Sequence, residues 1–235
     1  MRIGAAAALG RTFWEYLECV QEVGIKYVEI PCDIGYWKPI GALGYTPDNI
    51  LSLWPAQAMH SFPPEYVEPS TGRPSLEAKE KIESYGITTA GFYVKNDFLY
   101  TDPVKRDNEV KKIKELLRIA NKWGTVETLR IHGGEATNTN VWQLSLEKCI
   151  ELIIDGIQKS AKYAQEYGVA LALENHYLVL QDPDNLMRIY NEVSSDWFGF
   201  NVDTGNFHAY GYRPEKLKET FKLLAPYTKT THMKL

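Results

Sequence analysis

Residues 169–176, with the sequence VALALENH, decide the fold class. Bulky aliphatic residues alternate there with alanine and with Glu174, which is the two-residue period of a β-strand. Residues 198–203, with the sequence FGFNVD, alternate in the same way and end in Asp203. We expect the bulky face of each strand to meet helices and the small or polar face to point inward. Glu174 and Asp203 are therefore expected to project inward at the carboxyl ends of their strands.

Strand-like stretches of this kind alternate with longer helical patterns along the chain. We expect strands at residues 2–8, 25–31, 87–94, 126–132, 169–174, 198–203 and 228–233, and helices at 12–23, 75–85, 105–123, 145–167, 183–193 and 214–224. This alternation predicts a parallel sheet. The GxGxxG fingerprint of an open dinucleotide-binding sheet does not follow the first strand. Glu174, Asp203 and His232 follow one another at intervals of 29 residues, about one βα repeat. The predicted fold class is therefore α/β, a (β/α)8 TIM barrel rather than an open doubly wound sheet.

The pattern provides seven strands, and the seventh ends just before the last residue, Leu235. A complete barrel has eight strands in about 250 residues. We therefore expect one TIM-barrel domain over residues 1–235 that is truncated after the seventh strand, with the eighth βα unit missing. Without the eighth unit, the first and seventh strands would each have an open edge beside a gap. Open edges favour self-association as a homo-oligomer, or a terminus that covers the gap. Residues 33–74, rich in Pro, Gly, Tyr and Trp, are irregular and long enough to be a functional excursion.

Composition limits the partners and the compartment. The chain has 235 residues, of which 44% are hydrophobic and 24% charged, which is ordinary for a globular protein. Its net charge of -4 argues against a protein that binds nucleic-acid backbones. No apolar run approaches the roughly 18 residues needed to cross a membrane. The three cysteines form no CxxC pair, so we expect a reducing cytoplasm rather than a disulfide framework or a cysteine zinc site.

Polar residues at the predicted strand ends form the candidate site. Four of the five histidines fall at or just after a strand end, namely His132, His176, His208 and His232. The two carboxylates and one imidazole of Glu174, Asp203 and His232 suit a divalent metal ion such as Mn, Mg, Co or Zn. The alternative is a set of hydrogen-bonded polar groups that cap strands. We favour the metal site because three inward residues stand in register at successive strand ends.

Three motifs in order resemble the sugar phosphate isomerase/epimerase superfamily, the group of xylose isomerase-like TIM barrels. They are LENH at residues 173–176, NVDTGNF at residues 201–207 and THMK at residues 231–234. The resemblance implies that Glu174, Asp203 and His232 bind one divalent metal ion. In the family a Glu on the eighth strand is the fourth ligand and a second acid/base group. This sequence has no counterpart of that Glu, and the family's HxKD motif reads HMKL at residues 232–235.

The resemblance also implies a mechanism, which is proton transfer next to a sugar carbonyl through an enediolate. The metal would polarise the carbonyl, and Glu174 would be the catalytic residue that removes or returns the proton. Five residues are candidate substrate contacts, namely His132, His176, Asn206, His208 and Lys234. The structural alternatives are that His132 is a hydrogen-bonded interior histidine and that Asn206 only stabilises the turn after Asp203.

The leading hypothesis is a cytoplasmic, divalent-metal-dependent isomerase or epimerase that binds neither nucleic acid nor membrane. Its substrate would be a small keto-sugar, sugar phosphate or polyol derivative. A second enzyme hypothesis is a DNA repair nuclease of the endonuclease IV branch, which needs more histidine ligands and a basic DNA-facing surface. Five histidines and a net charge of -4 argue against it. A third hypothesis is a truncated or degenerate barrel that binds a sugar or a partner without turnover.

Overall fold

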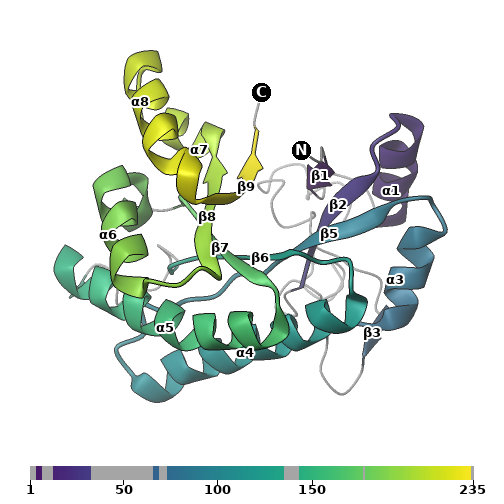
Figure 1. Ribbon diagram of the computed structural model, residues 1–235, viewed down its shortest axis with the longest axis horizontal. Helices are drawn as coiled ribbons and strands as arrows, with labels where there is room; N and C mark the ends of the chain where they lie inside the picture. The colour runs from purple at the N-terminus through teal and green to yellow at the C-terminus, as the bar shows by residue number, and fades with distance from the viewer. Residues whose placement is uncertain are drawn as a thin grey trace, which may run out of the picture. The chain divides into compact units, whose positions relative to one another are not determined.

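The computed structural model describes residues 4–6, 13–32, 66–68, 73–134, 143–176 and 178–233 (Figure 1). Most of the stretch 33–74 lies outside these residues, as does Lys234, so what was expected of them stays a prediction. The chain divides into two compact units, residues 1–93 with 123–126 and residues 94–122 with 127–235. The expected single domain over the whole chain likewise stays a prediction.

The first unit contains three parallel strands in the order β1-β2-β5. Its elements are β1 (Gly4–Ala6), α1 (Phe13–Glu22), β2 (Tyr27–Pro31), the antiparallel pair β3 (Val67–Glu68) and β4 (Arg73–Pro74), α3 (Leu76–Glu83) and β5 (Thr88–Tyr93). Figure 1 shows α1 and α3 on one side of β2 and β5. Leu17 of α1 and Ile82 of α3 are fully buried, as are Ile30 and Phe92 of the strands. The apolar faces of both helices thus supply the core of this unit.

The second unit contains four parallel strands in the order β6-β7-β8-β9. Its elements are most of α4 (Pro103–Trp123), β6 (Thr128–Ile131), α5 (Leu146–Tyr167), β7 (Ala170–Glu174), η6 (Leu178–Gln181), α6 (Pro183–Val193), β8 (Phe198–Asp203), α7 (Thr204–Ala209), α8 (Pro214–Leu224), η7 (Ala225–Tyr227) and β9 (Thr228–His232). Figure 1 shows α5, α6 and α8 covering one face of β7 and β8. The described residues therefore contain the seven parallel strands, alternating with helices along the chain, that the sequence predicts.

Local sequence fixes the ends of the long helices. Ser145 begins α5 by accepting a hydrogen bond from the backbone N–H of Lys148. Gly168 ends α5 with a φ of 67°, a left-handed conformation that glycine adopts without strain. Pro183 and Pro214 begin α6 and α8, where a missing N–H costs no hydrogen bond. These ends confirm the predicted helices 183–193 and 214–224.

Helix α7 and the β3–β4 pair were not expected from the sequence pattern. Helix α7 has six residues and follows β8 without a loop, because Asp203 both ends the strand and caps the helix. A helix this short shows no full 3.6-residue apolar stripe, so periodicity does not reveal it. The β3–β4 pair has two residues per strand, which is too short for an alternating pattern.

Close packing in the second unit depends on glycine. A Cβ at Gly156 of α5 would overlap the ring of Phe98, which is fully buried. A Cβ at Gly134, after β6, would lie 2.5 Å from Leu99 Cδ1 and 2.7 Å from Asp97 Oδ1. The chain segment after residue 94 can therefore lie against α5 and β6 only because these positions have no side chain.

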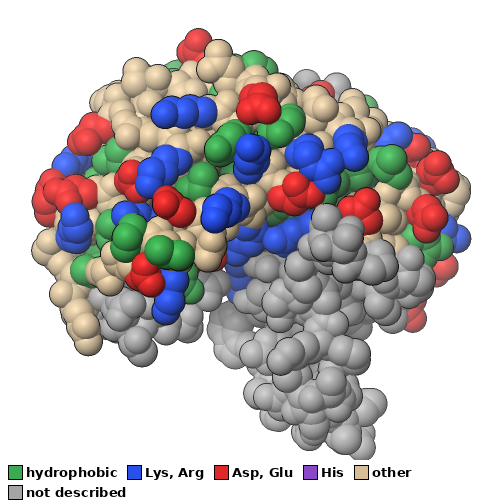
Figure 2. Space-filling model, turned by 90° about the horizontal axis from the view of Figure 1, so that it is seen from below, with side chains coloured by type: hydrophobic (Ala, Val, Ile, Leu, Met, Phe, Trp, Pro, Cys, Tyr) green, Lys and Arg blue, Asp and Glu red, His purple; other side chains and the backbone are tan. Residues whose placement is uncertain are grey.

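The described surface has mixed charge. Figure 2 shows Lys and Arg side chains interspersed with Asp and Glu on one face of the molecule. Several of these charges are paired, such as Lys159 with Asp107 and Asp155, and Arg188 with Glu147. In the part of the chain that the structure describes, no helix has the length and apolar character needed to traverse a bilayer.

Candidate functional site

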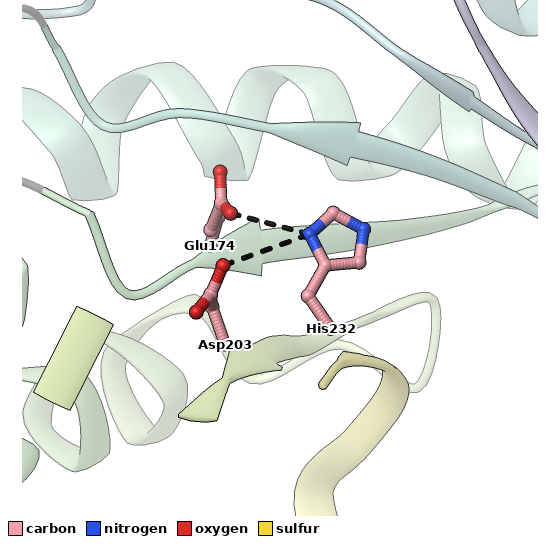
Figure 3. Close-up of side chains that lie close together, drawn as sticks. All are labelled: Glu174, Asp203 and His232. Atoms are coloured by element: carbon pink, nitrogen blue, oxygen red, sulfur yellow. Dashed lines mark ion pairs between the residues drawn. The ribbon is translucent and has the colours of Figure 1, made fainter. Parts of the chain in front are cut away.

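Glu174, Asp203 and His232 converge at the carboxyl ends of three neighbouring strands (Figure 3). They are the last residues of β7, β8 and β9. The Nδ1 atom of His232 lies 3.4 Å from Glu174 Oε1 and 3.8 Å from Asp203 Oδ2. Each residue offers one donor atom, and these three atoms lie within 4.8 Å of one another. The structure thus brings together the three residues that the sequence singled out as metal ligands.

The register of the strands explains this convergence. Asp203 is paired with His232, and Glu174 is paired with Asn201, two residues before Asp203. Because strand side chains alternate between faces, residues two apart on β8 share a face with their partners. Asp203 Oδ1 accepts a hydrogen bond from the backbone N–H of Asn206 at the start of α7. Its other oxygen, Oδ2, is the one turned toward His232.

Arg130 contacts the second carboxylate oxygen of Glu174. Its Nη1 atom donates to Glu174 Oε2 at 2.5 Å and lies 3.3 Å from His132 Nε2. Arg130 lies on β6, and His132 follows the end of that strand by one residue, so the two share a face as the alternation predicts. The two carboxylate oxygens of Glu174 therefore have different neighbours, because Oε2 faces Arg130 and Oε1 faces His232.

These contacts determine the charges at the site. Burial alone would raise the pKa of Glu174, but the Arg130 guanidinium, followed by the hydrogen bond with His232, holds that pKa well below its usual value. Burial lowers the pKa of His132 to about 3, with Glu174 opposing and Arg130 reinforcing the shift. At neutral pH Glu174 is thus ionised and His132 neutral. A guanidinium can only donate, so His132 Nε2 accepts from Arg130 and the ring carries its hydrogen on Nδ1.

The other predicted substrate contacts occupy different positions around these residues. His132 Nε2 lies 3.5 Å from Glu174 Oε2. The ring of His176 stands edge-on to that of His132, with the centroids 5.6 Å apart. Asn206 is buried in the first turn of α7, and His208 is exposed on the same helix. Of these predicted contacts, His132 lies against Glu174, and His176 lies against His132.

Sequence reasoning missed two contacts of this site. The alternation of residues 126–132 is enough to put Arg130 and His132 on one face, but sequence reasoning could not pair Arg130 with Glu174, because alternation gives the face of a side chain and not its neighbour on another strand. It also gave no role to Asn175, whose side chain bonds the backbone of Asp203. The only available signal for Asn175 was its place inside the LENH motif.

The donor set fits a divalent metal ion. Two carboxylate oxygens and one imidazole nitrogen are donors that Mg, Mn, Co and Zn accept. The carboxylates are 4% (Glu174) and 0% (Asp203) exposed, and Glu174 is ionised despite its burial. Among the described residues, this is the one group of three or more His, Cys, Asp or Glu side chains with such convergent donor atoms.

A family model described as xylose isomerase-like TIM barrel matches residues 51–234. Among solved structures, D-psicose 3-epimerase from Clostridium cellulolyticum H10, determined with D-tagatose, is 15% identical, with 99% of this chain and 73% of that chain covered and a TM-score of 0.66. The 3-keto-D-glucoside 4-epimerase from E. coli is also 15% identical, with 99% of this chain and 78% of that chain covered and a TM-score of 0.66. The IOLI protein with a bound zinc atom is 17% identical, with 99% and 72% covered and a TM-score of 0.66. No curated protein sequence matches the chain.

The family match and these likenesses confirm the predicted fold class, an α/β TIM barrel. At identities of 15% to 17% the solved structures establish the fold and not the reaction.

Proposed function

Because the chain belongs to the xylose isomerase-like TIM barrel family, we propose that it is a divalent-metal-dependent isomerase or epimerase. Its substrate would be a small keto-sugar, sugar phosphate or polyol derivative. The observation that carries this proposal is the convergence of Glu174, Asp203 and His232, whose donor atoms lie within 4.8 Å of one another. Two structural neighbours are sugar epimerases and a third contains zinc, which supports the proposal.

The metal would be held by Glu174 through Oε1, by Asp203 through Oδ2 and by His232 through Nδ1. When bound, the ion supplies positive charge that polarises a sugar carbonyl and an adjacent hydroxyl. Glu174 is the proposed acid/base residue, which moves a proton at the carbon beside that carbonyl. Arg130 keeps Glu174 ionised and fixes its orientation through Oε2. If the proton returns to the neighbouring carbon, the reaction is an isomerisation. If a proton returns to the same carbon from the opposite face, the reaction is an epimerisation.

Neutral His132 and the adjacent His176 are the proposed contacts for substrate hydroxyl groups. His132 lies against Glu174, and the ring of His176 lies against that of His132. A neutral imidazole can donate from one nitrogen and accept at the other, which suits a hydroxyl group. Asn206, His208 and Lys234 remain further proposed contacts, of which His208 is the most exposed of the described ones.

Metal titration of matched variants tests the proposal. Glu174→Gln should weaken Mn²⁺ binding by at least ~10-fold, since it removes an anionic ligand. The control is Glu147→Gln, which removes an exposed carboxylate paired with Arg188 and should leave the Kd unchanged. Isothermal titration calorimetry measures both. Equal Kd values for wild type and Glu174→Gln would contradict the proposed site.

Deuterium exchange tests the chemistry without a known product. Wild-type protein with Mn²⁺ and a panel of keto-sugars in D₂O should introduce deuterium at the carbon beside the carbonyl, measured by ¹H NMR. Glu174→Gln should slow this exchange by ~10²–10⁴-fold.

The second candidate function is sugar binding without turnover. It is favoured by the number of ligands, since the cluster among the described residues holds two carboxylates and one imidazole and no third carboxylate. Saturable sugar binding without deuterium incorporation would establish it in place of the first.

A further inference from the structure

Two buried asparagines bond the backbone of another strand end in the same way. The Asp203 N–H donates to Asn175 Oδ1 at 2.6 Å, and Asn175 Nδ2 donates to the Asp203 carbonyl at 3.0 Å. The His132 N–H donates to Asn96 Oδ1 at 2.7 Å, and Asn96 Nδ2 donates to the His132 carbonyl at 2.6 Å. Both asparagines are 1% exposed. Each side-chain amide thus replaces both partners that the strand-end peptide groups would otherwise need.

The Asn175 bonds connect two of the candidate metal ligands. Asn175 directly follows Glu174 in the chain, so one peptide bond and two hydrogen bonds join the backbone of Glu174 to that of Asp203. The segment is held in turn by two more hydrogen bonds. The His176 N–H donates to the Glu174 carbonyl at 2.8 Å, and Gln181 Nε2 donates to the Asn175 carbonyl at 3.4 Å.

This connection limits the movement of the two carboxylates relative to each other. Asp203 is fully buried, and its backbone groups at the end of β8 are fixed by Asn175 rather than by water. A side chain projects from a direction set by its backbone, and Arg130 and the Asn206 N–H hold the two carboxylates in place, so the fixed backbone restricts the separation of the carboxylates. Two negative charges that repel each other are then held at one separation before a cation arrives, and less order is lost on binding.

We propose that Asn175 is a positioning residue that preorganises Glu174 and Asp203 for a divalent metal ion. This inference rests on the proposed function and assigns to Asn175 a role in metal affinity besides its role in stability. Asn175 contacts the metal ligands only through their backbone, so its effect on the metal is indirect.

Asn96 provides a matched control within the same chain. Its side chain has the same burial, the same two hydrogen bonds and nearly the same distances as Asn175. It holds His132, which is not one of the three converging ligands. A loss of metal affinity that follows replacement of either asparagine therefore indicates general destabilisation. A loss of metal affinity that follows only the replacement of Asn175 indicates positioning of the ligands.

The experiment compares wild type with Asn175→Ala and Asn96→Ala. Each variant removes two hydrogen bonds to buried backbone groups, so both melting temperatures should fall by a similar amount, roughly 2–12 °C. Calorimetric titration with MnCl₂ should show a ~10–100-fold higher Kd for Asn175→Ala, the usual range for residues that support metal ligands. The Kd of Asn96→Ala should stay within ~3-fold of wild type. If Asn175→Ala does not fold, Asn175→Ser is used, because its hydroxyl can bond a water molecule in the vacated space.

A spectroscopic measurement separates positioning from stability. The visible absorption bands of bound Co²⁺ report the geometry of its ligands, and they should shift in Asn175→Ala and not in Asn96→Ala. Equal Mn²⁺ affinities and unchanged Co²⁺ spectra in both variants would overturn the positioning role while leaving the proposed function standing. Equal losses of affinity in both variants would also overturn it. A wild-type protein that binds neither ion would overturn the proposed function and this inference together.

Discussion

Each of the two carboxylate oxygens of Glu174 has a different neighbouring side chain. Arg130 binds Oε2 at 2.5 Å, while Oε1 faces His232. A buried carboxylate without such a cation would have a raised pKa and would hold a proton at neutral pH. The ion pair prevents this, so Glu174 stays available as an anionic ligand. The same pairing makes Glu174 a weaker base for the proposed proton transfer.

His132 should make the stability of the metal-free protein depend on pH. Burial lowers its pKa to about 3, against about 6.5 in the unfolded chain. Between these values the unfolded state binds a proton that the folded state does not, so stability falls as the pH falls. One such group contributes up to ~1.4 kcal/mol per pH unit. Urea unfolding with a chelator present, between pH 7 and pH 4, measures this slope.

Replacement of the imidazole isolates the contribution of His132. His132→Asn should flatten the slope of the free energy of unfolding against pH. The control is His208→Asn, which removes an imidazole that is exposed on α7. The assignment of the slope to His132 is wrong if both variants keep the wild-type pH dependence.

At the scale of elements, α5 contacts Phe98 through a glycine. Mid-helix glycine is normally less favourable than alanine by about 1 kcal/mol. Gly156 is explained by the ring of Phe98, which a Cβ at this position would overlap. The sequence alone showed a regular helical stripe in residues 145–167 and gave no reason for a glycine in its middle.

Gly156→Ala should therefore destabilise the protein by about 1–3 kcal/mol through overpacking. In a Phe98→Ala background the overlap is absent, so the same change should stabilise by about 0.5–1 kcal/mol through helix propensity. Urea unfolding of the four proteins gives both differences. A loss of the same size in both backgrounds would show that Phe98 is not the cause.

At the scale of the whole molecule, β9 pairs with β8 and with no other strand among the described residues. Its Lys229 and Thr231 are exposed. Within the described part of the chain one edge of β9 has no partner strand, and such an edge favours pairing with another chain, so we expect a homo-oligomer. Size-exclusion chromatography with light scattering should give a mass above the 26.8 kDa of one chain. A monomer at all concentrations between 1 and 100 μM, on the order of working concentrations, would contradict this expectation.

Much of the barrel could be predicted from the sequence because its signals are local. Alternation at residues 169–174 and 198–203 reports burial on one face of a strand, and Gly168 ends its helix through its own backbone. The 29-residue spacing of Glu174, Asp203 and His232 equals one βα repeat, so equivalent positions had to recur at one end of the sheet. The three candidate ligands were therefore identifiable before their distances were known.

Only the tertiary structure decided which groups meet across strands. The ion pair of Arg130 with Glu174 and the bonds of Asn175 to Asp203 join residues 44 and 28 positions apart. Their geometry depends on strand order and register, and a shift of register by one residue would turn every side chain to the other face. The overlap that requires Gly156 depends likewise on how α5 packs on Phe98. The sequence by itself determined which residues stand at strand ends, whereas packing decided which partners set their charge and position, because those contacts form only when distant segments are brought together.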